Sequence, residues 1–262
     1  MLCKDTVDLS ASLQADDQLL ALITKRQGGS ATHAWDGVMG IGPDALSFVG
    51  GNITPLSNLV KSGKLARPLA GILLVKENKI TGARGGGEYR WGGINSAYVL
   101  GSIIYAPVTS SYFWGCDMSN VWVNHQDMFT SVDHGRAIID TGTTLIYTSN
   151  PIAKNIHAQI PGSTFKSSEG AYYVPCDVSK SPNVFFTIQG YQWGVPASDI
   201  AFRASGNGDD LCVSGIQGGS PSYTILGDVF IKNHYIVLNY GNNKNFSLSI
   251  GFANRTDITP IL

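Results

Sequence analysis

The residues of this chain that are best suited to chemistry are four consecutive ones, Asp140, Thr141, Gly142 and Thr143. They place one carboxylate in a loop of small residues. A carboxylate in such a loop can act as a general base and take a proton from a water molecule. Gly142 has no side chain, so the backbone can come close to whatever faces the carboxylate. The segment therefore predicts a hydrolytic site around Asp140.

Two apolar segments are predicted to position this loop. Ile138 and Ile139 come directly before it, and their branched side chains are typical of a buried strand. Later in the chain, residues 225–227 read Ile-Leu-Gly. An earlier segment, residues 38–40, reads Val-Met-Gly and repeats the pattern of two apolar residues followed by a glycine. This weak repeat indicates two related halves.

This loop resembles the active-site loop of pepsin-like aspartic proteases of fungal type. Residues 35–42, before the loop, and residues 223–231, after it, resemble segments of the same family, and their order and spacing suit it. The resemblance covers residues 4–253. It implies an all-β, bilobal fold and an aspartic-type endopeptidase, which hydrolyses peptide bonds with a carboxylate-activated water and needs no cofactor. It also implies the following roles: catalysis by Asp140, support of the active-site loop by Thr141, Gly142, Thr143 and Thr144, and a substrate cleft lined by Ile138 and Ile225.

The family uses two Asp-Thr-Gly loops, and this chain has one. Two neighbouring carboxylates repel each other, which splits their pKa values, so that one stays ionised as the base and the other stays protonated as the acid. Asp5 and Thr6 are followed by valine and not glycine, so they fit a plain strand. Asp228, which follows Ile-Leu-Gly, is interpreted as a structural carboxylate because family members carry it without a catalytic duty.

The apolar-apolar-Gly segment at residues 38–40 has no loop of its own to support. We therefore expect a truncated chain that lacks the first Asp-Thr-Gly and the flap. Residues 1–95 would be the remnant of the N-terminal lobe, and residues 96–262 a complete C-terminal lobe that carries Asp140. In this interpretation the missing N-terminal segment supplies the second catalytic aspartate.

Composition agrees with an all-β fold. Charged residues are 14% of the 262, and 31 glycines and 11 prolines favour short strands joined by turns. Strands are expected at residues 6–9, 21–25, 69–76, 89–94, 112–123, 136–140, 172–175, 184–188 and 235–239. Helices are expected at residues 55–63, ended by Gly63, and at residues 150–159, with Asn150 as cap and Pro151 in the first turn.

The four cysteines fall into two kinds. By the family resemblance, Cys176 and Cys212 form a disulfide of the second lobe. Cys116 lies where a strand residue is expected and is interpreted as a buried free thiol. The state of Cys3 stays open. Three N-x-[ST] sequons, at Asn52, Asn245 and Asn254, weakly support a secretory route.

Other functional classes find little support. The net charge of −1 does not suggest nucleic acid or an anionic membrane as a partner, and no apolar run is long enough to span a bilayer. The five histidines have no paired spacing, so no metal site is expected. A G-x-S-x-G elbow is missing, which argues against a serine hydrolase. The first residues do not resemble a signal peptide, and the full-length parent is expected to be secreted or vacuolar.

Three functional hypotheses follow. The first is an aspartic endopeptidase of which this chain is a part, with peptide or protein substrates. The second is a non-catalytic, peptide-binding pseudo-protease lobe. The third is a homodimer in which two copies of Asp140 meet, and it ranks lowest because residues 1–95 should occupy the face where a second copy would dock.

Overall fold

The computed structural model describes residues 1–25, 36–47, 53–76, 85–129, 135–206, 208–220, 222–241 and 247–261. Strands dominate this part of the chain and form five sheets, which confirms the expected all-β class. The described helices are all short. They are α1 (Pro55–Lys61), α2 (Asn150–Ala158), α3 (Ala197–Ile200), α4 (Asp228–Ile231) and the 3-10 turns η1 (Asp44–Leu46) and η2 (Ser96–Tyr98). Trp35 and the sequon residues Asn52 and Asn245 lie outside the described residues.

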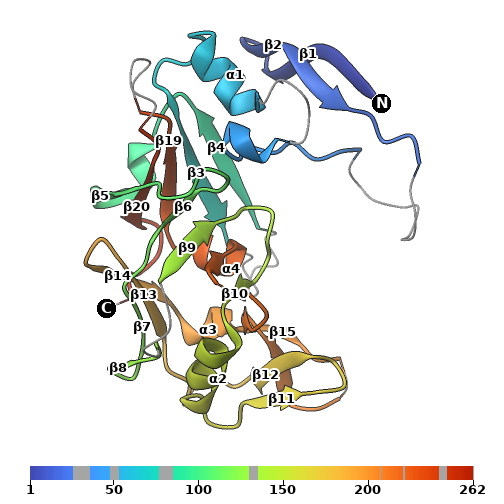
Figure 1. Ribbon diagram of the computed structural model, residues 1–262. Helices are drawn as coiled ribbons and strands as arrows, with labels where there is room; N and C mark the ends of the chain where they lie inside the picture. The colour runs from blue at the N-terminus through green and yellow to red at the C-terminus, as the bar shows by residue number, and fades with distance from the viewer. Residues whose placement is uncertain are drawn as a thin grey trace.

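The chain begins with a hairpin of β1 (Leu2–Ser10) and β2 (Leu13–Ala21). β1 contains the strand expected at residues 6–9. The strand expected at residues 21–25 is wrong, because β2 runs from Leu13 to Ala21 and residues 22–25 form no strand. Gln18 is 2% exposed there and donates to the carbonyl of Ile53, so tertiary contacts favour the strand. Figure 1 shows the hairpin and α1 at the top of the molecule.

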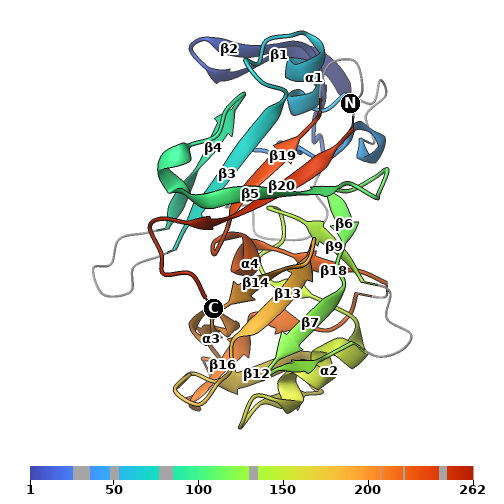
Figure 2. The ribbon, with the colours of Figure 1, turned by 90° about the vertical axis from the view of Figure 1, so that its left-hand side faces the viewer.

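A five-stranded antiparallel sheet connects distant parts of the chain. Its order is β4 (Gly86–Trp91), β3 (Leu69–Val75), β19 (Tyr235–Asn239), β20 (Ser249–Arg255) and β5 (Val99–Pro107). The sheet is seen from another side in Figure 2. β3 and β4 come from residues 1–95, whereas β5, β19 and β20 come from residues 96–262. The two predicted parts therefore share one sheet, and the lobe boundary after residue 95 stays a prediction.

The sheet that carries Asp140 has the order β17 (Ile216–Gln217), β10 (Ile146–Tyr147), β18 (Thr224–Leu226), β9 (Arg136–Ile139) and β6 (Gly115–Asp117). β9 and β18 are parallel neighbours, which places Ile138 opposite Ile225 and Ile139 opposite Leu226. Ile138 is 8% and Ile139 5% exposed, which confirms the predicted buried strand. The two apolar segments that the sequence singled out therefore lie side by side.

Two further sheets complete the lower part of Figure 1. One has the order β14 (Tyr191–Val195), β13 (Val184–Ile188), β7 (Asn120–Val123) and β8 (Gln126–Asp127). The other has the order β11 (Thr164–Lys166), β12 (Ala171–Pro175), β16 (Leu211–Ser214) and β15 (Ala201–Ala204). The disulfide predicted between Cys176 and Cys212 is present and joins the end of β12 to β16.

Most of the other expected elements are confirmed, with small shifts at their ends, but residues 112–123 form two strands, β6 and β7, that belong to different sheets. α1 ends at Lys61, two residues before Gly63, whose φ of 68° suits a glycine. The cap of α2 is Ser149 and not Asn150, because the Ser149 hydroxyl accepts the amide of Ile152. Pro151 lies in the first turn, as predicted.

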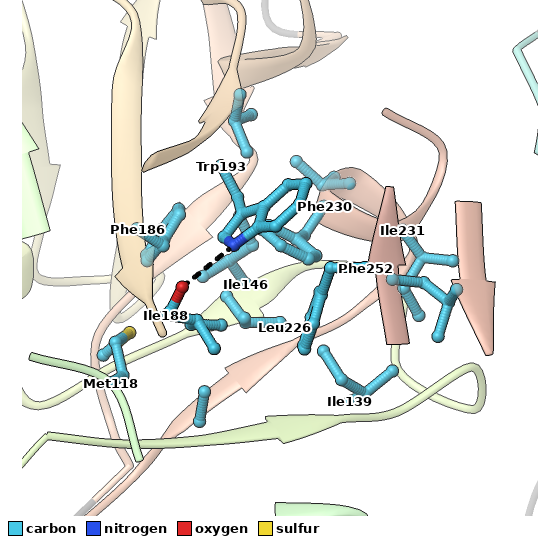
Figure 3. Close-up of a cluster of buried hydrophobic side chains, with 14 of the residues drawn as sticks. Met118, Ile139, Ile146, Phe186, Ile188, Trp193, Leu226, Phe230, Ile231 and Phe252 are labelled. Atoms are coloured by element: carbon cyan, nitrogen blue, oxygen red, sulfur yellow. Dashed lines mark hydrogen bonds between the residues drawn. The ribbon is translucent and has the colours of Figure 1, made fainter. Parts of the chain in front are cut away.

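A large apolar core includes side chains of the sheet that carries Asp140. Figure 3 shows its central side chains, with Trp193 packed near Phe230 and Phe252 and donating its indole N–H to the carbonyl of Ile188 at 3.4 Å. Phe186 meets Phe230 edge to face, with ring centroids 5.8 Å apart. The core therefore ties α4 to β13, β14 and β20.

Cys116 is fully buried and free, as predicted, and burial raises the pKa of its thiol to about 12. Cys3 is also free, and it is partly exposed. In the part of the chain that the structure describes, no helix is long and apolar enough to cross a membrane.

Candidate active site

Hydrogen bonds from its own loop fix the carboxylate of Asp140. The Gly142 amide donates to Oδ1 at 2.9 Å, and the Thr143 hydroxyl donates to Oδ2 at 2.6 Å. The Asp140 amide donates to the carbonyl of Leu226 at 3.2 Å, which attaches the loop to β18. Each carboxylate oxygen thus accepts one bond from a group two or three residues away, so a backbone amide and a side-chain hydroxyl of the same loop orient the carboxylate.

Gly227 allows α4 to approach this loop. A Cβ added to Gly227 would meet the carbonyl oxygens of Thr143 and Leu145 far inside van der Waals contact. The Asp228 amide then donates to the Thr143 carbonyl at 2.8 Å, and the Val229 amide donates to the Thr144 carbonyl at 3.0 Å. The start of α4 and the Asp140 loop therefore form one hydrogen-bonded unit, and a glycine is required where they touch.

Asp228 follows the glycine that packs on the Asp140 loop, and its carboxyl group feels the charge of Asp140. Burial and, after it, the negative charge of Asp140 raise the pKa of Asp228 to about 6, while Lys232 acts in the opposite direction. Among the described residues, Oδ1 of Asp228 is buried and has no hydrogen-bond partner. The structural role expected for Asp228 stays a prediction, but the sequence did not indicate this proximity to Asp140.

An apolar cavity of about 460 Å³ opens above Asp140. Thr141, Gly142, Ile138 and Ile225 line it together with Asp140. Thr143 and Thr144 are not among its lining residues. Across the cavity lie residues from the earlier part of the chain and from the segment before β6: Val38, Met39, Gly40, Ile41, Tyr89, Phe113 and Trp114. The two apolar-apolar-Gly segments of the sequence therefore border one cavity.

Tyr89 is a residue of this cavity that sequence reasoning missed. It projects from β4, and its hydroxyl interacts with the side chain of Thr141. Burial raises the pKa of Tyr89, and the charges of Asp228 and Asp140 raise it further, while the contact with Thr141 lowers it. No spacing in the sequence signals this contact, because β4 and the Asp140 loop belong to different sheets.

This arrangement can support hydrolysis of a largely apolar ligand. A fixed carboxylate at the edge of an apolar cavity can act as a base toward water, and the cavity walls can exclude bulk solvent. A neighbouring carboxyl group whose pKa is raised can remain protonated under mildly acidic conditions.

Comparison with known proteins places these features in a family. A model of the family described as eukaryotic aspartyl protease matches residues 1–254. Rhizopuspepsin-1 of Rhizopus niveus is 33% identical over 240 residues, which are 91% of this chain and 58% of that protein. Syncephapepsin of Syncephalastrum racemosum is 32% identical over 238 residues, 90% of this chain and 57% of that protein. An aspartic protease of Phaffia rhodozyma is 33% identical over 256 residues, 95% of this chain and 58% of that protein.

The chain thus spans somewhat more than half the length of the curated relatives it matches. The match covers the Asp140 loop, its support at residues 225–227 and the earlier segment at residues 38–40. The resemblance drawn from these motifs is confirmed, and the chain belongs to the eukaryotic aspartyl protease family of pepsin-like enzymes.

Proposed function

We propose that the protein is an aspartic endopeptidase in which Asp140 is one of two catalytic carboxylates. The observation that carries this proposal is the carboxylate of Asp140, held by Gly142 and Thr143 at the edge of an apolar cavity. In the ionised state it would activate a water molecule for attack on a peptide carbonyl. Thr141 and Thr144 complete the supporting loop, and the apolar side chains of Ile138 and Ile225 suit a cleft for peptide side chains.

The second carboxylate is assigned to a segment equivalent to the part of the relatives that this chain does not cover. The partial span of 57–58% supports this assignment, since the relatives are substantially longer. Residues 38–40 line the cavity, which also supports this assignment. These residues would brace the second loop as residues 225–227 brace the first. We also propose that residues 1–95 are the remnant of the N-terminal lobe and that residues 96–262 form the C-terminal lobe.

In this mechanism the two carboxylates share one proton. The ionised group takes a proton from water while the neutral group polarises the scissile carbonyl, and the roles exchange when the amide nitrogen is protonated. Peptides or proteins are the substrates. The parent protein is proposed to be secreted or vacuolar, and the Cys176–Cys212 disulfide supports this because such bonds persist in oxidising compartments.

The test compares two nearly isosteric variants in the complete reading frame. Asp140→Asn should lower peptide hydrolysis by at least about 10²-fold, because it removes the general base. Asp5→Asn is the matched control, since Asp5 is the other aspartate followed by threonine and lies exposed on β1. It should keep full activity. An Asp140→Asn variant that stays active would refute the proposal. A complete protein that binds peptides and hydrolyses none would favour a pseudo-protease.

A further inference from the structure

A second cavity is separate from the one above Asp140. It has a volume of about 360 Å³ and opens on the outer face of the sheet formed by β14, β13, β7 and β8. In Figure 2, β7 and β13 of this sheet lie towards the viewer. Among the described residues, none lines both cavities. The volume lies in the range of about 300–1,000 Å³ that is typical of ligand-binding pockets.

Two aromatic side chains form the apolar part of this second cavity. Trp122 on β7 and Phe185 on β13 lie directly opposite each other in the antiparallel register. Their neighbours Val121 and Phe186 are fully buried in the core. Because side chains alternate along a strand, both aromatic rings belong to the outer face. The Trp122 indole N–H donates to the Thr187 hydroxyl at 3.1 Å, so the cavity has an aromatic surface that is held in place.

Amide side chains form the polar part of the cavity, and they belong to Asn124, Asn183 and Gln192. The side-chain oxygen of Asn183 accepts the backbone amide of Ala197 at 3.1 Å, which fixes the plane of this group. An amide side chain carries both donors and acceptors, as a hydroxyl group of a ligand does. Among the described residues that line the cavity, none is a lysine, arginine, aspartate or glutamate. The lining is therefore matched to a neutral ligand that is rich in hydroxyl groups.

The turn between β7 and β8 also lines the cavity, and its two residues have an unusual backbone conformation. Asn124 has a φ of 50° and His125 a φ of 61°, in the left-handed region that glycine adopts without steric cost. Positive φ at both positions is typical of the two-residue turn that joins hairpin strands. Strain in residues other than glycine is concentrated at ligand-binding sites. Since both side chains line the cavity, contact with a ligand gives a reason for their presence in place of glycine.

We propose that this cavity binds a neutral saccharide. The C–H face of a sugar ring would stack on Trp122 or Phe185, and its hydroxyl groups would exchange hydrogen bonds with the three amide side chains. A peptide fits less well. The backbones of β7 and β13 are already paired on both sides within the sheet, so they have no free edge to which a peptide strand could add. The proposal does not depend on hydrolysis at Asp140.

The experiment follows the indole N–H signal of Trp122 by NMR in the 262-residue chain, with the signal assigned from its loss in Trp122→Phe. Linear trisaccharides of glucose, mannose and N-acetylglucosamine are the probes, and at least one should shift the signal to saturation. Gln192→Ala, which removes one amide, should raise the Kd about three- to tenfold. Tyr191→Ala is the control, because it removes an exposed aromatic residue of β14 that is outside the lining, and it should leave the Kd unchanged.

Asn124→Gly separates a ligand contact from a structural role. Glycine relieves the positive φ, so the free energy of unfolding should stay the same or rise, whereas the Kd should again rise about three- to tenfold. Unchanged Kd values in both Gln192→Ala and Asn124→Gly would overturn the proposal. A signal that no trisaccharide shifts, or that only an uncharged peptide shifts, would also overturn it.

A free oligosaccharide and a glycan attached to a protein share this chemistry, and a further titration distinguishes them. The probe is a glycoprotein with neutral, mannose-rich glycans, before and after enzymatic deglycosylation. Binding that is at least about tenfold tighter than that of the free trisaccharides and is lost on deglycosylation would identify an attached glycan as the ligand. Equal affinity for both would identify the saccharide alone. Because none of these measurements requires hydrolysis, their outcome is independent of the Asp140→Asn test of the proposed function.

Discussion

The hydroxyl of Thr143 donates a hydrogen bond of 2.6 Å to Oδ2 of Asp140, while the carbonyl of the same threonine accepts the amide of Asp228. One residue therefore orients the candidate catalytic carboxylate and anchors the helix that brings a second carboxyl group beside it. The side chain and the backbone of Thr143 thus have different partners, and the side-chain contact requires a hydroxyl group.

Removal of the Thr143 hydroxyl should impair turnover more than folding. A hydrogen bond to a charged group contributes about 1.5–3 kcal/mol, so Thr143→Val in the complete protein should lower kcat about 10- to 100-fold. Thr143→Ser should retain most of the activity. The matched control is Thr109→Val, because the Thr109 hydroxyl also donates to an aspartate, Asp117, at 3.2 Å on the surface. Equal losses of kcat in both valine variants would contradict the role given to Thr143.

A methyl group at Gly227 should separate α4 from the Asp140 loop. Because the added Cβ would overlap the carbonyl oxygens of Thr143 and Leu145, we expect Gly227→Ala to lower the free energy of unfolding by about 3 kcal/mol. Gly86→Ala is the control, since no atom lies within 4 Å of its added Cβ. Urea denaturation of the chain measures both. A Gly227→Ala variant as stable as the parent would mean that the close approach is absent in solution.

The disulfide should contribute measurably to stability. It closes a loop with a sequence separation of 36, for which the chain-entropy model gives about 3–4 kcal/mol. Paired replacement of Cys176 and Cys212 by serine should lower the unfolding free energy by this amount. Cys3→Ser, which removes a free thiol from the hairpin, should change it little. An unchanged denaturation midpoint in the double variant would contradict the expected contribution.

His234 should limit stability at acidic pH. It is 3% exposed and packs against Trp193 and Phe230, and burial lowers its pKa to about 3. In the unfolded chain the His234 imidazole has a pKa near 6.5, so it takes up a proton at a higher pH than in the folded protein. The stability that the neutral, buried imidazole provides is therefore fully present above that pH. It falls by about 1.4 kcal/mol per pH unit as the pH drops toward 3. His157, whose pKa burial lowers to about 4, acts in the same direction.

Denaturation at several pH values tests this dependence. Between pH 6 and 3, the free energy of unfolding of His234→Phe should depend less steeply on pH than that of the wild type, and the difference in slope should correspond to about one proton. A His234→Phe profile with the same slope as the wild type would show that His234 does not take up a proton on unfolding in this range.

The sequence predicted those parts of the fold that local patterns determine. The run Ile138-Ile139 before a loop of small residues indicated both a buried strand and the position of Asp140, and the structure confirms the strand. β13 and β19 begin and end where expected, because each is a compact apolar run. The shift of the α2 cap by one residue reflects two adjacent residues, Ser149 and Asn150, that are both good caps.

Features that depend on distant residues could not be predicted in this way. β2 contains Asp16, Asp17 and Gln18, which are uncommon in strands, and pairing with β1 and contacts with α1 stabilise it. The raised pKa of Asp228 arises from burial and from Asp140, which lies 88 positions earlier in the chain. Neither effect leaves a local pattern in the sequence.

The central claim is that Asp140 is one half of a carboxylate pair. The most direct measurement is an experimental structure of the protein from the complete reading frame. We expect that a second aspartate, from outside these 262 residues, places its carboxylate about 3 Å from that of Asp140, close enough to share a proton. A structure in which no carboxylate from outside this chain approaches Asp140 would contradict it.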